Sequence, residues 1–202
     1  MTDARARFLD DLVAAGIDDA DVLDALGAVD RARFLPDVPE DWVYEDGVLP
    51  DGVHHSQPLT VARLCALCGV GPGDCVLEVG TGSGYQAAVL AHLGPRSIVT
   101  IEREVRWADL ARRRLVGLDS VQVIVGNGRL GYRPGAPYDV IVVNAAAPAP
   151  PPPLLEQIAV GGRLVMPVGE ATEVQEWEVR ERRPGGCWSR STHGTVRFTP
   201  LE

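Results

Sequence analysis

Short apolar runs alternate with helical patterns along the chain from residue 75 onward. The apolar runs predict strands at residues 75–79, 98–101, 121–125, 140–143 and 163–168. Patterns with helical periodicity predict helices at residues 85–93, 104–115 and 154–159. Strands that alternate with helices usually form a parallel sheet with right-handed crossovers, so we expect an α/β fold with a Rossmann-like core.

The N-terminal part predicts helices and loops in place of this alternation. Residues 4–26 have a helical periodicity with one break, after which Asp18 or Asp19 can cap a second helix. Residues 34–50 are rich in proline, aspartate and aromatic residues, which predicts an ordered loop laid over the domain. Pro58 fits the first turn of a further helix.

The C-terminal part predicts two strands, at residues 174–182 and 195–199, with no helix between them. Such a hairpin would place an antiparallel C-terminal strand in the mostly parallel sheet. The length suits one domain, so we expect a single domain over residues 1–202. Residues 1–73 would form a helical and loop cap, and residues 74–202 would form the core.

The segment from Val76 to Gln86 carries the most informative pattern in the chain. An apolar strand enters a turn with glycine at every second position, and a helix follows at once. Glycine has no Cβ, so the backbone can approach a ligand closely, and the start of the helix offers unpaired N–H groups. The next strand ends in Glu102, whose carboxylate can accept hydrogen bonds from both hydroxyls of a ribose. This combination predicts a cofactor that contains a nucleoside.

The spacing of the glycines bears on which cofactor binds. A dinucleotide fingerprint has a third small residue, for tight helix–strand packing, where this chain has Tyr85. The spacing of Gly80, Gly82 and Gly84 suits an S-adenosylmethionine loop better. An ordinary strand–helix turn without a ligand is the alternative interpretation of the glycines.

Further separated segments carry a family resemblance. The most specific are Ser56-Gln57-Pro58, ahead of the glycine loop, and Ala145-Ala146-Ala147-Pro148, after the fourth strand. The others are Tyr44-Glu45-Asp46, Val76 to Leu90, Thr100-Ile101-Glu102-Arg103, Gly126-Asn127-Gly128, Gly161 to Gly169, Val196-Arg197-Phe198 and Pro200-Leu201. Together they resemble the protein-L-isoaspartate O-methyltransferases over about residues 8–201. The resemblance implies a Rossmann-like class I methyltransferase that uses S-adenosylmethionine.

The resemblance implies roles for the residues of a cofactor site. The loop of Gly80, Thr81, Gly82, Ser83 and Gly84 should hold the methionine part of the cofactor. Glu102 should hold the ribose. Asn127, followed by Gly128, stands where the family usually has an aspartate that contacts the adenine; an asparagine oxygen can still accept a hydrogen bond from the adenine amino group. A plain Gly-Asn-Gly turn is the alternative.

The resemblance also implies an acceptor site around Ser56. The family assigns an active-site role to this serine, whose hydroxyl can orient the acceptor carboxylate or the substrate backbone. The alternative is that Ser56 only caps the helix entered at Pro58. His54 and His55 replace the Thr-Ile that the family commonly has, so the acceptor pocket should differ. The remaining residues expected on the substrate side are Gln57, Val196 and Arg197.

The expected reaction is methyl transfer from S-adenosylmethionine to the carboxylate of L-isoaspartyl residues in proteins or peptides, as a protein repair step. An alternative is methylation of a normal aspartate in a ribosomally made peptide, leading to an aspartimide. The residues at His54 and His55 motivate that alternative, because they touch the acceptor side. A non-catalytic cofactor-binding regulatory protein is a third candidate, against which the glycine loop, Glu102 and Ser56 argue.

Composition narrows the partners and the location. The 202 residues carry a net charge of −9 and no lysine, which disfavours nucleic acid as a partner. No apolar run approaches the ~20 residues that cross a membrane, and no signal-peptide pattern is present, so we expect a cytoplasmic monomer. Cys65 and Cys68 lack a second pair at zinc-like spacing; we expect them to be buried and apolar, and we expect no metal site.

Overall fold

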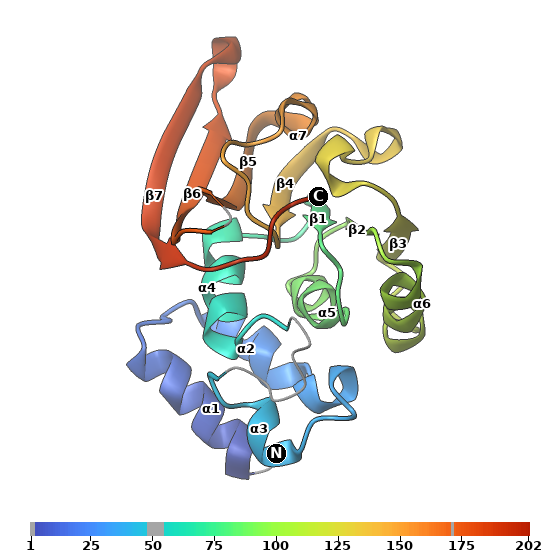
Figure 1. Cartoon of the computed structure of the whole chain (residues 1–202), viewed down its shortest axis with the longest axis vertical. Coiled ribbons are helices and arrows are strands. Elements are labelled where there is room, and N and C mark those ends of the chain that lie inside the picture. The colour runs from blue at the N-terminus through green and yellow to red at the C-terminus, as the bar shows by residue number, and fades with distance from the viewer. Residues whose placement is uncertain (1–2, 48–54, 171) are drawn as a thin grey trace.

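A mostly parallel sheet organises the residues that the computed structural model describes, 3–47, 55–170 and 172–202. Seven strands within these residues form the sheet, in the order β3-β2-β1-β4-β5-β6-β7 (Figure 1). The strands are β1 (Cys75–Val79), β2 (Ser97–Glu102), β3 (Val121–Val125), β4 (Tyr138–Val143), β5 (Ile158–Val168), β6 (Gln175–Arg182) and β7 (Trp188–Val196). β1 to β5 pair in parallel, β6 is antiparallel to β5, and β7 is antiparallel to β6. The predicted α/β fold is confirmed.

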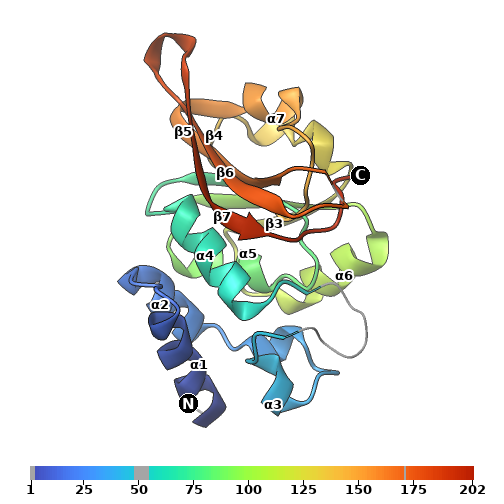
Figure 2. The same cartoon turned by 60° about the vertical axis from the view of Figure 1, so that its left-hand side comes forward.

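Different helices cover the two faces of the sheet (Figure 2). On one face lie α4 (Pro58–Cys68), α5 (Tyr85–His92) and α6 (Val105–Arg114), and on the other lies the short α7 (Pro152–Glu156). Alternate residues of a strand point to opposite faces. Val76 therefore packs in one hydrophobic cluster with Leu64 and Leu90, whereas its neighbour Leu77 packs in a second cluster with Leu154.

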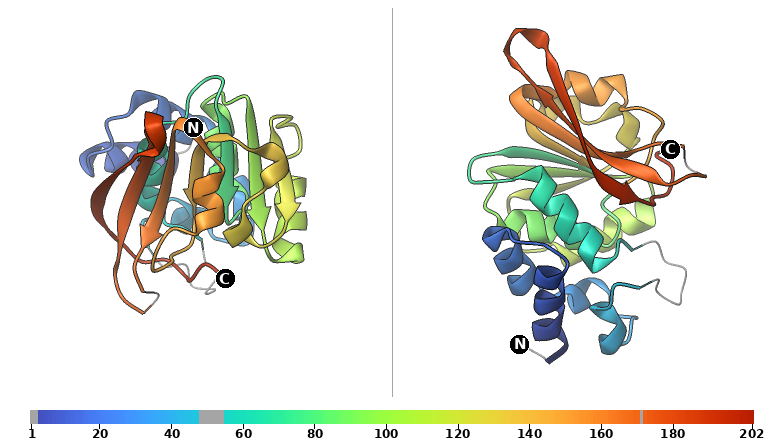
Figure 3. Two further views of the ribbon diagram at one scale, coloured as in Figure 1. Left: turned by 90° about the horizontal axis from the view of Figure 1, so that it is seen from above. Right: turned by 90° about the vertical axis from the view of Figure 1, so that its left-hand side faces the viewer.

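The first residues form a helical layer beside α4 and α5 (Figure 3). Its elements are α1 (Asp3–Ala14), α2 (Ala20–Ala28), the 3-10 helix η1 (Arg31–Phe34) and α3 (Glu40–Val43). Asp19 caps α2, because its side chain accepts a hydrogen bond from the Val22 N–H at 3.0 Å. Phe8 and Leu26 are buried in the same hydrophobic cluster as Val76. This shared core supports the single domain with a cap at 1–73 and a core at 74–202, which stays a prediction.

Two predicted boundaries near the C-terminal end are wrong. The last strand is β7, which begins at Trp188 rather than at residue 195; most of its side chains are exposed at the sheet edge, so no apolar alternation marks it. β5 begins at Ile158, where a helix was expected. The start of β5 was missed because it contains Gly162, and glycine is not typical of a strand. A glycine is needed there: beside an irregularity in the β4–β5 pairing, a Cβ at this position would lie 2.7 Å from the Asp139 carbonyl oxygen.

Candidate functional site

A cavity of about 730 Å³ lies at the carboxyl ends of β1, β2 and β4. Val79 pairs with Ile101 on one side and with Val143 on the other. The residues that follow these three strands therefore meet at one edge of the sheet, where ligands of open parallel sheets collect. The central position of β1 makes this edge the junction of both halves of the sheet.

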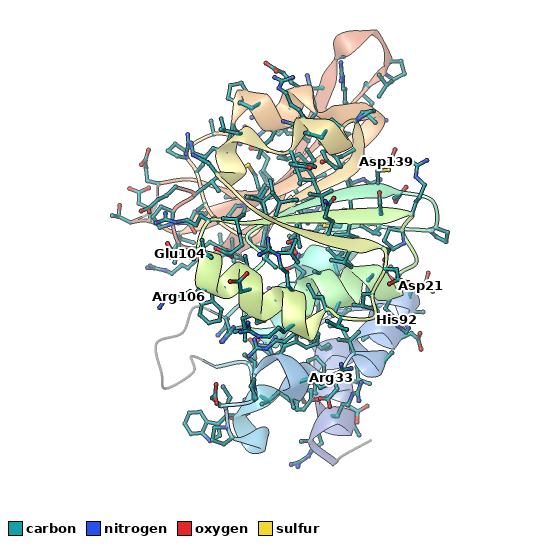
Figure 4. All side chains as sticks on the ribbon, turned by 90° about the vertical axis from the view of Figure 1, so that its right-hand side faces the viewer. Asp21, Arg33, His92, Glu104, Arg106 and Asp139 are labelled. Atoms are coloured by element: carbon teal, nitrogen blue, oxygen red, sulfur yellow. The ribbon has the colours of Figure 1, made fainter. Side chains whose placement is uncertain are left out.

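Several separate parts of the chain line this cavity. They include the loop after β1 with the first turn of α5, the ends of β2 and β4 with the first turn of α6, Gly128 after β3, residues around Arg31 in η1 and around Ser56 before α4, and residues 199–202. Figure 4 shows Glu104 and Arg106 from this lining at one end of α6, whereas His92 and Asp139 lie toward the opposite side of the molecule. The cavity thus joins the N-terminal cap, the glycine loop and the C-terminal residues.

The glycine loop follows β1 in a conformation that requires glycine. Gly80, Gly82 and Gly84 all have positive φ, at 95°, 52° and 87°. Gly80, Thr81, Gly82 and Ser83 line the cavity, as the sequence predicts. Gly84 is not in the lining; a Cβ there would lie 3.2 Å from Leu115, so Gly84 lets the start of α5 pack against α6. The structure thus gives Gly84 a packing role, and its expected contact with the cofactor stays a prediction.

Glu102 is fixed by the backbone at the edge of the cavity and is 8% exposed. Its Oε2 accepts a hydrogen bond from the Gly82 N–H at 2.9 Å, and its Oε1 accepts one from the Glu104 N–H at 3.1 Å. A carboxylate has about four lone-pair sites, so each oxygen can accept one more hydrogen bond. The position and the remaining acceptors suit two vicinal hydroxyls of a ribose.

A second buried carboxylate, which the sequence analysis missed, lies one residue before the end of β1. Glu78 is fully buried and accepts hydrogen bonds from Thr100 Oγ1 at 2.5 Å and from Asn144 Nδ2 at 3.3 Å. Burial raises the pKa of Glu78 to about 8, partly opposed by these two hydrogen bonds. Thr100 also lies 2.6 Å from the hydroxyl of Thr81, which lines the cavity. A charged residue inside an apolar strand run was the sequence signal for this group.

Several unpartnered polar atoms indicate that the cavity suits a polar ligand. Among the described residues, Gln86 Nε2, Asn144 Oδ1 and Tyr85 Oη are buried without a hydrogen-bond partner, and all three residues line the cavity. Buried polar groups are normally hydrogen-bonded, so these atoms point to groups that a ligand supplies. Together with Glu102, they fit a nucleoside-containing cofactor with polar substituents.

The two neighbouring residues that are expected at the adenine lie in different surroundings. Gly128 is buried and lines the cavity, and a Cβ there would lie 2.3 Å from Val79. Asn127 is exposed and outside the lining; its Oδ1 accepts a hydrogen bond from the Arg129 N–H at 2.9 Å, which caps a 3-10 helix. The adenine contact of Asn127 therefore stays a prediction. What the structure shows is that its side chain stabilises the turn that follows β3.

Ser56 lines the cavity, and the alternative that it caps α4 is wrong. The N-cap residue of α4 is Gln57, which makes no side-chain cap bond. The Leu59 N–H of the first turn instead donates to Asp46 Oδ1 at 3.1 Å. Among the described residues, the Ser56 hydroxyl makes no helix-capping hydrogen bond, so helix capping does not explain why a serine stands here.

The other residues expected on the acceptor side are dispersed. His55 lines the cavity and contacts Trp107 of α6 edge to face, with ring centroids 5.9 Å apart. His54 lies outside the described residues. The remaining three, Gln57, Val196 and Arg197, lie outside the cavity lining, and residues 199–202 form the C-terminal part of the wall instead.

The two neighbouring cysteines lie in the apolar interior of the protein. Cys65 and Cys68 are fully buried, as predicted, and burial raises the pKa of both thiols. Among the described side chains, no group of three or more histidine, cysteine, aspartate or glutamate residues could hold a metal ion. None of the described helices has the length and apolar composition that a membrane span requires.

The sheet order, the glycine loop and the carboxylate at the end of β2 define a class I methyltransferase. The chain belongs to the protein-L-isoaspartate O-methyltransferase family: residues 3–202 match the family model described as Protein-L-isoaspartate(D-aspartate) O-methyltransferase (PCMT). The family resemblance in the sequence is thereby confirmed.

Curated relatives extend over the same length. A protein-L-isoaspartate O-methyltransferase from Methylorubrum populi is 46% identical, over 100% of this chain and 96% of its own length. One from Protochlamydia amoebophila is 42% identical, over 94% of this chain and 92% of its own length.

Solved structures share the fold. A protein-L-isoaspartate O-methyltransferase has a TM-score of 0.85 and 26% identity; the match covers 98% of this chain and 66% of that one. A putative Plasmodium falciparum enzyme, crystallised with S-adenosyl-L-homocysteine, has a TM-score of 0.81 and 23% identity, with 98% of both chains covered. At this identity the second similarity concerns the fold alone.

Glu102→Ala should weaken S-adenosylmethionine binding at least about tenfold, because even one lost hydrogen bond to a charged group costs ~1.5 kcal/mol. Isothermal titration calorimetry of the purified protein measures this affinity. Glu104→Ala is the matched control, because the Glu104 side chain is exposed at the same cavity. The affinity of this variant for S-adenosylmethionine should stay within about twofold of wild type. Equal affinity in wild type and Glu102→Ala would exclude the ribose role.

Glu78→Gln should remove a pH dependence of folding stability. The pKa of Glu78 is about 8 in the folded chain against an ordinary value of 4.5, so the folded state binds more protons between these values. Its stabilising contribution is therefore full below the ordinary pKa and is lost as pH rises through the folded pKa, by up to ~1.4 kcal/mol per pH unit. Urea unfolding from about pH 5 to about pH 8 should show wild type losing stability relative to Glu78→Gln. Parallel pH curves for the two proteins would contradict the assignment.

Proposed function

We propose that the chain transfers a methyl group from S-adenosylmethionine to the free carboxylate of L-isoaspartyl residues in proteins or peptides, as a repair step. The full-length match to the isoaspartate methyltransferase family carries this proposal. The cavity supports it, because it brings the glycine loop and Glu102 together with Ser56. The alternatives drawn from the sequence gain no such support.

The reaction requires little acid–base catalysis. The acceptor carboxylate is already ionised near neutral pH, so no general base has to remove a proton. When bound, the sulfonium supplies an electrophilic methyl group: a carboxylate oxygen bonds to the methyl carbon while the carbon–sulfur bond breaks and its electron pair stays on sulfur. The product is a neutral methyl ester, whose methoxy group leaves as methanol far more readily than an oxygen leaves a carboxylate, so succinimide closure and, by hydrolysis, return to aspartate can follow.

The contribution of the chain is therefore alignment and exclusion of water. We assign the cofactor to Glu102 and the loop from Gly80 to Ser83, with Asn127 and Gly128 beside the adenine. Ser56 would orient the acceptor carboxylate, and His55 would border it. Residues 199–202 and Trp107 close parts of the cavity wall and limit the access of water.

The net charge bears on the partner of this protein, and the shared hydrophobic core bears on its number of domains. The partner is a protein or peptide that carries the damaged residue, and the net charge of −9 opposes binding to nucleic acid. We propose a cytoplasmic monomer built as one domain. The hydrophobic cluster shared by the N-terminal helices and the sheet supports that single domain.

Two peptides of one sequence test the function, one with an L-isoaspartyl residue and one with a normal aspartyl residue. Incubation with S-adenosylmethionine and the enzyme should add one methyl group to the isoaspartyl peptide, detected by mass spectrometry. The aspartyl peptide should stay unmodified under the same conditions. Methylation of the aspartyl peptide alone would overturn the proposal in favour of aspartimide formation, and methylation of neither would argue against the reaction.

Ser56→Ala should lower methyl transfer at least about tenfold while cofactor affinity and thermal stability stay near wild type, because an orienting contact is lost and no helix cap is removed. Steady-state kinetics with the isoaspartyl peptide and a melting curve measure both effects. Ser120→Ala, outside the cavity lining, is the control and should match wild type. Unchanged turnover in Ser56→Ala would leave this serine without a role in the reaction.

A further inference from the structure

Arg31 is a buried cation in the cavity lining that the sequence analysis did not single out. It is 3% exposed and lies in η1, in the N-terminal cap. Its Nε donates to the Val43 carbonyl at 2.8 Å, and its Nη2 donates to the Ser56 carbonyl at 2.9 Å. Its Cζ lies 4.8 Å from the centroid of the Tyr85 ring. Arg31 is thus held beside Ser56 by two carbonyls and an aromatic face.

The contacts of Arg31 leave its charge without a carboxylate. Among the described residues, none of the ion pairs includes Arg31, although buried charges are normally paired. Burial lowers the pKa of the guanidinium, and this is opposed by the neighbouring Tyr85 and by Tyr44 and Asp46. The Oδ1 of Asp46 accepts the Leu59 N–H instead. An anion at this end of the cavity would stabilise the buried cation.

The geometry leaves Arg31 capable of binding such an anion. A guanidinium has five N–H donors, and the two carbonyl bonds use two of them. The donors left over belong to Nη1 and Nη2, which can present a fork to a carboxylate. Gln86, whose Nε2 is buried without a partner, lines the same cavity and is a further donor.

We propose that Arg31 binds the acceptor carboxylate beside Ser56. This assignment rests on the proposed function, because it requires an anionic acceptor in the cavity. Binding of the carboxylate by Arg31 would also favour substrate over product at this position. The carboxylate is held by charge before transfer, and the neutral ester formed by transfer loses that attraction, which favours release of the product.

A purely structural role for Arg31 makes a different prediction. If the guanidinium only fixed the backbone at Ser56, its loss would weaken every acceptor to the same extent. If it contacts the acceptor, its loss weakens only ligands that carry the negative charge. The two roles therefore separate in a double-mutant cycle in which one of the two changes is made in the ligand.

The experiment compares an L-isoaspartyl peptide with a twin whose free carboxylate is replaced by a carboxamide. Their affinities for wild type and for Arg31→Gln are measured by calorimetry in the presence of S-adenosylhomocysteine, which cannot donate a methyl group. Wild type should bind the carboxylate peptide at least about tenfold more tightly than the carboxamide twin. Arg31→Gln should bind the two with nearly equal affinity, and Arg31→Lys should keep part of the preference.

Arg182→Gln is the matched control, because Arg182 also donates to a carbonyl, that of Ile158, but lies outside the cavity lining. It should retain the wild-type preference. An unchanged preference in Arg31→Gln would overturn the proposal, and so would a wild type with no preference, whatever the folding of the variants. Failure of the proposed function is distinguishable, because wild-type enzyme would then leave the isoaspartyl peptide unmethylated in mass spectrometry.

Discussion

The parallel pairing of β1 with both β2 and β4 is the constraint on which the site depends. Val79 is in register with Ile101 and with Val143, so the three strands end at one level. The next residues along each strand are those that a ligand meets, the glycine loop after β1, Glu102 and Asn144. A shift of one residue in either pairing would turn every side chain of a strand to the opposite face and separate these groups.

Buried polar groups behind the loop make this edge rigid. Glu78 sits under the loop, and its contacts to Thr100 and Asn144 tie β1 to both neighbouring strands. Asn144 also donates to the Gly80 carbonyl at 3.0 Å. Each of these groups would cost free energy if left unpaired, so the network penalises loop conformations that break it. The loop is thereby held in shape before a ligand enters, which lowers the cost of binding.

The cavity lining carries charges of both signs, whereas the chain as a whole is strongly negative. The protein carries a net charge of −9, yet a buried guanidinium lies beside Ser56 in the proposed acceptor region. The cofactor region instead presents a carboxylate, that of Glu102. In the proposed arrangement, Arg31 would attract the anionic acceptor and Glu102 would accept hydrogen bonds from the ribose of the cofactor, so that each ligand is oriented without a proton transfer.

The sequence alone determined the elements that depend on local pattern. The glycine loop, the strands around it and Glu102 are adjacent in sequence or follow from apolar periodicity, so they could be predicted. A last antiparallel strand was predicted, but its start could not be, because an exposed edge strand has no apolar alternation. The start of β5 was missed as well, because a glycine pair interrupts its apolar pattern. The Ser56 position came from resemblance rather than from its own local pattern, which by itself favoured a helix cap.

Only the tertiary structure decided which distant residues share the cavity. Arg31, Ser56 and the C-terminal residues 199–202 come from separate parts of the chain. Arg31 and Ser56 reach the cavity because the N-terminal helices pack on the same face of the sheet as α5, whereas residues 199–202 reach it because Pro200 pairs with Ala146 after β4. The structure also placed Gly84 in a helix contact and left Val196 outside the lining. Local periodicity predicts which side of a helix or strand is buried. Which other element covers that side depends on the packing of the whole chain.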